Sequence, residues 1–268
     1  MIGKFKFSRK QLCFPYGVFL LMFVIFPLLL VVYYAFTDSN GIFTVRNFIK
    51  FFSSKEELGN LLFSMKLGFE TTLVCLLIGY PVAYILSRIK SSKKSILLLL
   101  FIMPMWINFV LRAMAMKELL TIIGIFGKTE YNYLNTVIGM VYDYLPFMIL
   151  PLYSVLIKMD RSLEEAASDL GANKLKVFMS VTFPMSFAGI LSGITMVFLP
   201  SMTCYVISDT FGNRKVTIIG KLIELYFGQG DNWNYGSVIA LVMLTIMLIT
   251  TLLTNSLSKQ ENPRGTNL

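Results

Sequence analysis

Residues Leu12–Phe36 read LCFPYGVFLLMFVIFPLLLVVYYAF, and these 25 residues contain no Asp, Glu, Lys or Arg. A helix of about 20 apolar residues crosses the hydrocarbon core of a bilayer, so this stretch predicts a transmembrane helix. Four basic residues precede it, as in a secretory signal, but the apolar run is too long and its end lacks a small-residue cleavage site. We interpret the stretch as a retained anchor helix.

The whole chain shares this apolar character. Of its 268 residues, 56% are apolar and only 15% are charged, with a mean hydropathy of +0.69. Soluble domains carry about a quarter of their residues as charged side chains, so a soluble enzyme, a secreted disulfide scaffold and a disordered chain are excluded. Histidine is absent, and Cys13, Cys75 and Cys204 are far apart. The sequence therefore predicts no metal site and no Cys-x-x-Cys redox chemistry.

Five further apolar stretches have the length of a membrane span: Leu67–Ser87, Ser95–Met116, Leu134–Ile157, Met185–Ser208 and Tyr235–Leu257. None alternates polar and apolar residues as a barrel strand does, so each is expected to be a helix. Prolines inside five of the six stretches predict kinks. The predicted fold is all-α: a polytopic bundle of six transmembrane helices in one domain, 12–257, between a basic N-terminus, 1–11, and a tail, 258–268.

The distribution of basic residues predicts the orientation of the bundle. Fourteen Lys and Arg residues lie in the two termini, the loop after the second span and the loop after the fourth, against nine in the other loops. The positive-inside rule then places both termini in the cytoplasm of a bacterial cell. The formal charge of +9 is interpreted as this signal together with attraction to anionic lipid, and not as nucleic-acid binding.

The loop after the fourth span, 158–184, is longer than a connection requires and predicts a helix of its own. Ser162 and Glu165 have the spacing of an N-terminal capping box, and Gly171 is a typical helix terminator. A cytoplasmic helix of about nine residues is therefore expected. Its apolar residues share one face: Leu163, Ala166, Ala167 and Leu170.

So short a helix is marginally stable alone, so its apolar face needs a partner. One alternative is the chain's own membrane domain or the lipid surface, and the other is a separate cytoplasmic protein. Small alanines at the centre of the face and acidic residues at Glu164, Glu165 and Asp169 are unlike a lipid-binding helix. The pattern favours a protein partner.

The same loop resembles a known family. Glu165-Ala166-Ala167, three residues, Gly171, nine residues and then Val181-Thr182-Phe183-Pro184 resemble the EAA signature of permease subunits of binding-protein-dependent ABC importers, with Val181 and Phe183 in place of the usual Ile and Leu. In that family the loop docks on a cytoplasmic ATPase. The resemblance implies that coupling to the ATPase involves Leu163, Glu165, Ala166, Ala167, Leu170 and Gly171.

Between about Asn60 and Gly236 the chain also resembles the permeases of spermidine/putrescine importers. The similar stretches are PMWINFVLR from Pro104, YDYLPFMILPLYS from Tyr142, EEAASDLGA from Glu164 and MVFLPSMTCYVISD from Met196. The resemblance implies a complex with a second, homologous permease, an ATPase dimer and an extracellular polyamine-binding protein. No Walker A sequence is present, so ATP and Mg are expected at the ATPase and no cofactor on this chain.

Three ionisable residues fall inside the predicted spans: Glu70, Arg112 and Asp143. An Asp or Arg facing lipid near the bilayer centre costs about 3 kcal/mol, so these side chains should face protein or water. Asp143, between Tyr142 and Tyr144, offers a carboxylate and aromatic faces to a polyammonium substrate, and is our first candidate for the substrate path. The alternative is a buried ion pair with Arg112 that joins two helices.

Three other residues each have two interpretations. Glu70 either lines the path or forms an interfacial pair with Lys66, and the spacing favours the pair. Asp209, after the fifth span, either lines the outer mouth or contacts the binding protein, or else caps the following loop. Trp106 either offers a cation–π surface to substrate or anchors its span at the membrane interface, and the anchor is favoured.

Three classes of function remain. The first is the ABC importer permease, and the second is a secondary transporter or channel for an organic cation, which needs no ATPase. The third, a membrane-embedded transferase, ranks lowest because histidine and a paired-aspartate metal motif are absent. The loop at 158–184 favours the first class over the second.

Overall fold

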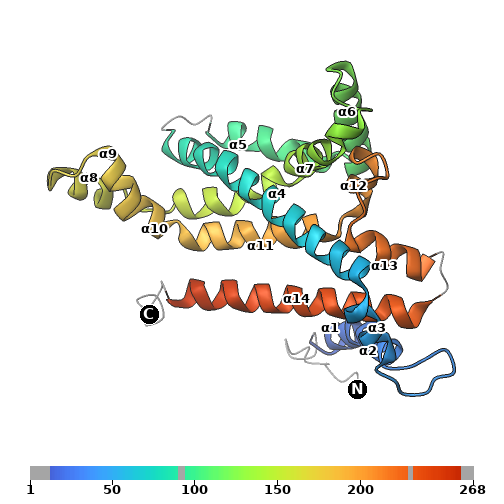
Figure 1. Ribbon diagram of the computed structural model, residues 1–268. Coiled ribbons are helices and arrows are strands. Elements are labelled where there is room, and N and C mark those ends of the chain that lie inside the picture. The colour runs from blue at the N-terminus through green and yellow to red at the C-terminus, as the bar shows by residue number, and fades with distance from the viewer. Residues whose placement is uncertain (1–12, 90–93, 229–231, 261–268) are drawn as a thin grey trace, which may run out of the picture. The chain divides into compact units, whose positions relative to one another are not determined.

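A computed structural model describes residues 13–89, 94–228 and 232–260 (Figure 1). The regular elements in these ranges are helices, with a single isolated β-bridge between Thr37 and Phe43. The predicted all-α class is confirmed. The chain divides into two compact units, one with residues up to Leu58 and Leu222–Thr245, the other with Gly59–Lys221 and residues from Ile246 onward.

The first unit begins with an apolar helix in three parts: α1 (Cys13–Leu20), the π-helical turn η2 (Leu21–Ile25) and α2 (Phe26–Ala35). It also contains α3 (Arg46–Ser53), the start of α4 (Lys55–Arg88), most of α13 (Ile219–Gly228) and the first half of α14 (Trp233–Gln260). The side-chain amide of Asn234 fastens α14 to the end of α2, because it donates to the carbonyl oxygens of Tyr34 and Thr37 at 3.1 and 2.8 Å.

The second unit is built around α7 and α11. Its elements are the rest of α4, α5 (Lys94–Ile102), η3 (Met103–Trp106), α6 (Phe109–Ile122), η4 (Thr129–Tyr131), α7 (Asn132–Leu156), α8 (Ser162–Asp169), α9 (Lys174–Val177), η5 (Phe178–Thr182), α10 (Phe183–Met185), α11 (Phe187–Thr203), α12 (Tyr205–Phe211) and the end of α14. A Cβ at Gly189 of α11 would lie 3.1 Å from the carbonyl oxygen of Pro151 in α7. The glycine therefore lets the two helices approach closely.

Four helices of the described residues have the length and composition of a membrane span: Phe14–Ala35, Lys55–Arg88, Thr129–Leu156 and Trp233–Leu257. Two bent pairs bring the number to six if each pair is one span: Ile96–Trp106 with Phe109–Ile122, and Lys174–Met185 with Phe187–Thr203. The fourth and sixth predicted spans are confirmed as the uninterrupted helices α7 and α14. Pro146 and Pro151 do not break α7.

The predicted span Ser95–Met116 is not one continuous helix, and the kink predicted at its proline is present as a break between two helices. The chain bends by 100° between η3 and α6. Pro104 lies in the 3-10 turn η3, Ile107 is extended, and the Asn108 side chain accepts a hydrogen bond from the backbone N–H of Val110 at 2.9 Å, which starts a new helix. The break therefore results from the proline together with a local capping residue.

Two other predicted bounds also differ. The fifth span was expected to reach Ser208, but α11 ends at Thr203, Cys204 leaves the helical region, and α12 follows. Pro200 lies inside α11, and its carbonyl oxygen still accepts from the N–H of Cys204 at 2.9 Å, so the proline does not itself end the helix. The second span was expected from Leu67, but α4 begins at Lys55, where the Ser54 hydroxyl accepts from the backbone N–H of Glu57 at 3.3 Å. At 1.5 Å per residue its 34 residues measure about 51 Å, longer than the hydrocarbon core.

The basic N-terminal segment 1–11, Leu12 and the tail beyond Gln260 lie outside the described residues.

Candidate functional site

The helix predicted in the long loop is present as α8, but its start is not the predicted capping box. Ser162 is already the first helical residue, and the N-cap position is taken by Arg161, whose side chain makes no cap hydrogen bond. The backbone N–H of Ser162 donates instead to the Asp160 carboxylate at 3.0 Å, which lowers the pKa of this exposed carboxyl group. The side chain that accepts from the first helical N–H is therefore Asp160, one residue before the N-cap. This Asx turn takes the place of the predicted capping box of Ser162 and Glu165.

The predicted end of α8 at Gly171 is confirmed. Gly171 has φ +84°, a conformation that side chains with a Cβ rarely adopt. The N–H of Ala172 donates to the carbonyl oxygen of Ala167 at 3.1 Å, and that of Gly171 to Ser168 at 2.9 Å. This Schellman-type arrangement satisfies carbonyls that the helix end would leave without partners.

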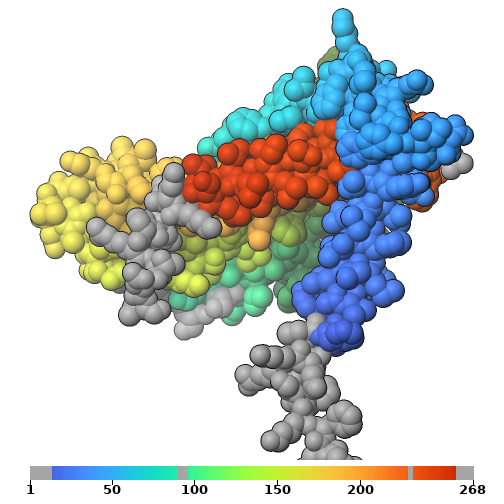
Figure 2. All heavy atoms as spheres, turned by 90° about the horizontal axis from the view of Figure 1, so that it is seen from below, coloured from blue at the N-terminus to red at the C-terminus, as the bar shows by residue number. Residues whose placement is uncertain are grey.

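The apolar face of α8 is not covered by the described part of the chain. Leu170 is 90% exposed and Leu163 is 45% exposed. Ala166 is exposed, and Ala167 is half-buried. Leu175 of α9, a residue outside the predicted helix, is 70% exposed as well. Figure 2 shows this segment in yellow at one end of the second unit. The surface has the character of a docking site.

The opposite side of α8 is fastened to the membrane helices. The Glu164 carboxylate forms an ion pair with Arg88, the last residue of α4, and accepts a hydrogen bond from the Thr182 hydroxyl at 2.6 Å. Arg161 donates to the carbonyl oxygens of Ser87 and Arg88, at 3.3 Å each. In Figure 1, α8 and α9 lie beyond the ends of α7 and α11. The sequence analysis assigned Glu164 only to a polar face and missed these contacts.

Arg112 and Asp143 form a buried ion pair between α6 and α7, and each residue is 7% exposed. The Arg112 guanidinium also lies 5.9 Å from the ring centroid of Tyr142. Tyr144 is 7% exposed, and packs in the core instead of facing an open path. The contact is the one expected from the helix-joining alternative, and a role of Asp143, Tyr142 or Tyr144 in the substrate path stays a prediction.

Glu70 lies 3.8 Å from the Nζ atom of Lys66, so the expected i, i+4 pair is present. The Tyr133 hydroxyl of α7 also donates to the Glu70 carboxylate at 2.5 Å. Glu70 therefore joins α4 to α7 in addition to pairing along its own helix.

Asp209 in α12 pairs with the Nζ atom of Lys221 at 3.0 Å. Its carboxylate is thus engaged by α13 instead of capping the following loop. Asp209 also lines an open recess of about 310 Å³ with Lys117 and Tyr205. Trp106 is 75% exposed at the end of η3. The structure does not gather Trp106 with Asp143, which is buried at the α6–α7 contact.

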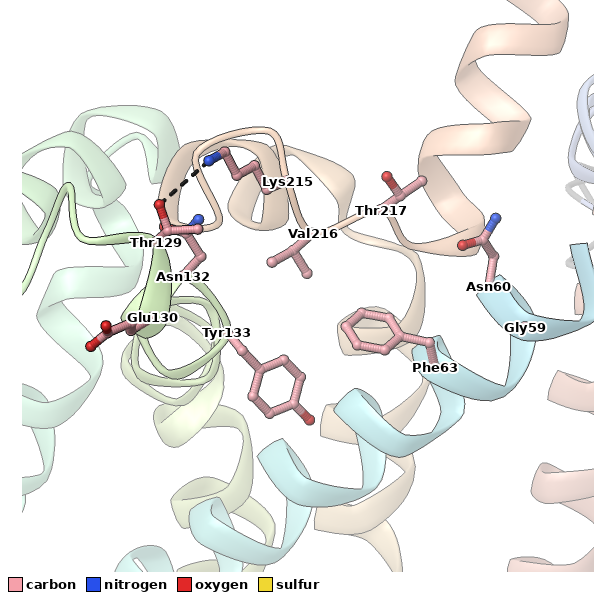
Figure 3. A pocket seen from close by; sticks show the side chains of 10 residues that line it. All are labelled: Gly59, Asn60, Phe63, Thr129, Glu130, Asn132, Tyr133, Lys215, Val216 and Thr217. Carbon is pink, nitrogen blue, oxygen red and sulfur yellow. Dashed lines mark hydrogen bonds between the residues drawn. The ribbon is translucent and has the colours of Figure 1, made fainter. Parts of the chain in front are cut away.

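A larger recess, of about 560 Å³, lies at the end of α7 opposite to α8. In Figure 3, Phe63 of α4 and Tyr133 of α7 project into it, and Lys215 donates to the Thr129 hydroxyl at 3.4 Å. Glu130 and Lys215 both line it, so the recess has no single sign of charge. No sequence motif marks these residues, which come from three separate parts of the chain.

A bundle of helices long enough to span a membrane, with an amphipathic helix held at one end, is typical of a transporter subunit. Residues 75–262 match the family described as the binding-protein-dependent transport system inner membrane component, and the chain belongs to this family. It is a permease subunit and a multi-pass inner membrane protein, as the resemblance implied.

Curated relatives cover most of the chain. It is 35% identical over 266 residues to the spermidine/putrescine transport system permease protein PotB of Haemophilus influenzae, covering 91% of each chain. It is 32% identical over 247 residues to PotB of Escherichia coli K12, covering 85% of this chain and 90% of that one. A solved bacterial ABC transporter that imports the acidic polysaccharide alginate has the same fold, with a TM-score of 0.75, 14% identity and 94% of each chain covered.

Proposed function

We propose that this chain is the permease subunit of an ATP-driven importer of polyamines of the spermidine and putrescine class, and that it forms half of the translocation path. The observation that carries the proposal is the 35% identity over 91% of both chains to a permease named for spermidine/putrescine transport. The fold neighbour transports an acidic polysaccharide and shares only 14% identity, so it supports the architecture and not the substrate.

The ATPase docks on α8. Its exposed apolar face supports this role for Leu163, Ala166, Ala167 and Leu170, with Glu165 beside them and Gly171 ending the helix. The fourteen Lys and Arg residues in the loops and termini that include α8 support a cytoplasmic location for α8 and for both termini. ATP and Mg bind to the ATPase, because this chain has no Walker A sequence.

The remaining partners follow from the family. A second, homologous permease completes the translocation path, two ATPase copies drive it, and an extracellular polyamine-binding protein delivers the substrate to the outer loops. A solved neighbour with a TM-score of 0.74 is a bacterial alginate ABC transporter in complex with a pentasaccharide-bound periplasmic protein, which supports this arrangement.

A substrate path through the membrane also belongs to this function. Asp143 and the rings of Tyr142 and Tyr144 remain its candidate residues, with Trp106 and Asp209 nearer the outer end. For a polyammonium group to reach Asp143, the Arg112 pair must open, since the carboxylate is buried in the described structure. Opening of α6 against α7 is then part of the transport cycle.

The test is uptake of radiolabelled spermidine and putrescine by cells that carry the whole operon, with this chain deleted and then restored. We expect uptake to disappear and return with the chain, and to stop when ATP is depleted while the proton gradient is kept. Uptake that persists without ATP but collapses with the gradient would instead establish a secondary transporter.

A further inference from the structure

A single carboxylate of α8 contacts two elements that lead into the membrane. Glu164 pairs with the Arg88 guanidinium at the end of α4, and both side chains are only 19% exposed. The hydroxyl of Thr182, the last residue of η5, donates to the same carboxylate at 2.6 Å. Charge-assisted hydrogen bonds of this kind are stronger than neutral ones, and a half-buried pair is screened less by salt than an exposed pair.

Two arginine side chains join α4 and α8, one from the end of α4 and one from the start of α8. Arg88 reaches from α4 to Glu164, and Arg161 reaches back from the start of α8 to the carbonyl oxygens of Ser87 and Arg88. These carbonyls belong to the last turn of α4, where intrahelical partners are missing. The Arg88 guanidinium also lies 5.2 Å from the ring centroid of Tyr84. α8 is therefore held to α4 at two points.

Thr182 connects α8 to a bend in the chain. It ends the π-helical turn η5, and the helix pair that contains this turn bends by 62° before α11. Irregular turns of this kind mark places where a helix changes direction. The Tyr80 and Ser186 hydroxyl groups are 2.8 Å apart, which ties α4 to the same bend. α8 therefore contacts both the end of α4 and the bent segment that leads into α11.

We propose that Arg88, Glu164 and Thr182, named here the α8 anchor, transmit the movement of α8 to α4 and α11. The inference rests on the proposed function, in which an ATPase moves α8. The anchor residues are positioning residues, because their contacts lie on the side of α8 away from its exposed apolar face. A loop without these contacts would absorb the displacement by changing its own backbone angles.

The experiment uses the complete importer in proteoliposomes, with ATP hydrolysis and radiolabelled spermidine uptake measured in parallel. Glu164→Gln removes the charge and keeps an acceptor for the Thr182 hydroxyl. We expect the ATPase to co-purify and to hydrolyse ATP near the wild-type rate, while uptake per ATP hydrolysed falls about tenfold. Thr182→Val should lower the same ratio by less. The matched control is Glu118→Gln, at an exposed residue of α6, which should leave the ratio unchanged.

A charge exchange tests whether the pair itself matters. Arg88→Glu alone should lower the ratio of uptake to hydrolysis, and Arg88→Glu combined with Glu164→Arg should recover part of it. If Glu164 variants do not fold, Thr182→Val still tests whether the anchor transmits the movement of α8. This change removes one hydroxyl group and keeps the size of the side chain.

Two results would overturn the α8 anchor. One is a wild-type ratio of uptake to hydrolysis in both Glu164→Gln and Thr182→Val. The other is a loss of co-purified ATPase with an unchanged ratio, which would mean that the contacts only place α8 for docking. Failure of the wild-type vesicles to import polyamine with ATP would contradict the proposed function itself, and the anchor with it.

Discussion

Arg112 of α6 and Asp143 of α7 form an ion pair in which each residue is only 7% exposed. The Nε atom of Arg112 is buried without a hydrogen-bond partner among the residues that the structure describes. Breaking a buried pair leaves one charge uncompensated, whereas replacing both partners by apolar residues is often neutral. Comparing a single replacement with a double replacement therefore distinguishes a pair that only joins two helices from a pair in which Asp143 also binds substrate.

Asp143→Leu alone should lower the stability of the complex by about 3 to 5 kcal/mol, because Arg112 then stays buried without a counter-charge. Arg112→Leu combined with Asp143→Leu should restore most of that stability. Thermal unfolding in detergent and spermidine uptake are measured on both variants. If Asp143 lies on the path, uptake stays low in the double variant. Restored uptake would contradict the path role and leave only the joining of α6 to α7.

Leu170→Glu should abolish co-purification of the ATPase without impairing folding. The side chain is 90% exposed, so a charge there costs little in the isolated chain but would be desolvated at an interface. The control is Ile42→Glu, at a residue 63% exposed between α2 and α3, which should keep the ATPase bound. Normal co-purification with Leu170→Glu is the outcome that the docking assignment does not allow.

Gly171→Ala should destabilise the end of α8 by about 1 to 2 kcal/mol, because the backbone φ of +84° places a Cβ in a strained conformation. Hydrogen exchange of the α8 amides measures the effect. Gly59→Ala is the control, since Gly59 is inside α4 with open space around it, and alanine favours a helix. Equal protection of the α8 amides from hydrogen exchange in the wild type and in Gly171→Ala would show that the turn at residue 171 does not end the helix.

Tyr226 of α13 donates a hydrogen bond to the buried carboxylate of Glu57 at 3.1 Å. Burial and the nearby Glu57 charge raise the pKa of Tyr226 above its ordinary value of 10.0. The stability from this contact is therefore fully present below pH 10 and is lost as the pH rises through the raised pKa. Thermal unfolding between neutral and alkaline pH should show this loss.

Tyr226→Phe should reduce stability at neutral pH by about 1 kcal/mol and weaken its dependence on alkaline pH. Tyr131→Phe, at an exposed tyrosine, serves as the control and should change neither quantity. The same alkaline dependence in the wild type and in Tyr226→Phe would assign the titration to another group.

Uninterrupted helices were predictable from apolar length, as α7 and α14 show, but the sequence could not tell which prolines would break a helix. Pro104 lies beside a 100° bend, whereas Pro146 lies inside a continuous helix. A proline removes one donor in either case, and its neighbours decide whether the helix continues. The end of α8 at Gly171 was predictable because the terminating residue is local in sequence.

Contacts between residues far apart in the sequence were predictable only where a charged side chain inside the membrane needs an opposite charge beside it. Arg112 and Asp143 are 31 residues apart, and their pairing follows from the cost of leaving either charge in lipid. Arg88 and Glu164 are 76 residues apart. In the sequence both belong to charged segments between predicted spans, where no pattern favours one partner over another.

The most direct test of the account is the accessibility of Leu170→Cys to a membrane-impermeant maleimide, in a background without the native cysteines. We expect no labelling in intact cells, labelling in inside-out vesicles that lack the ATPase, and protection when the ATPase is bound. Labelling of intact cells, or labelling that the bound ATPase does not reduce, would contradict the central claim that α8 is a cytoplasmic docking helix.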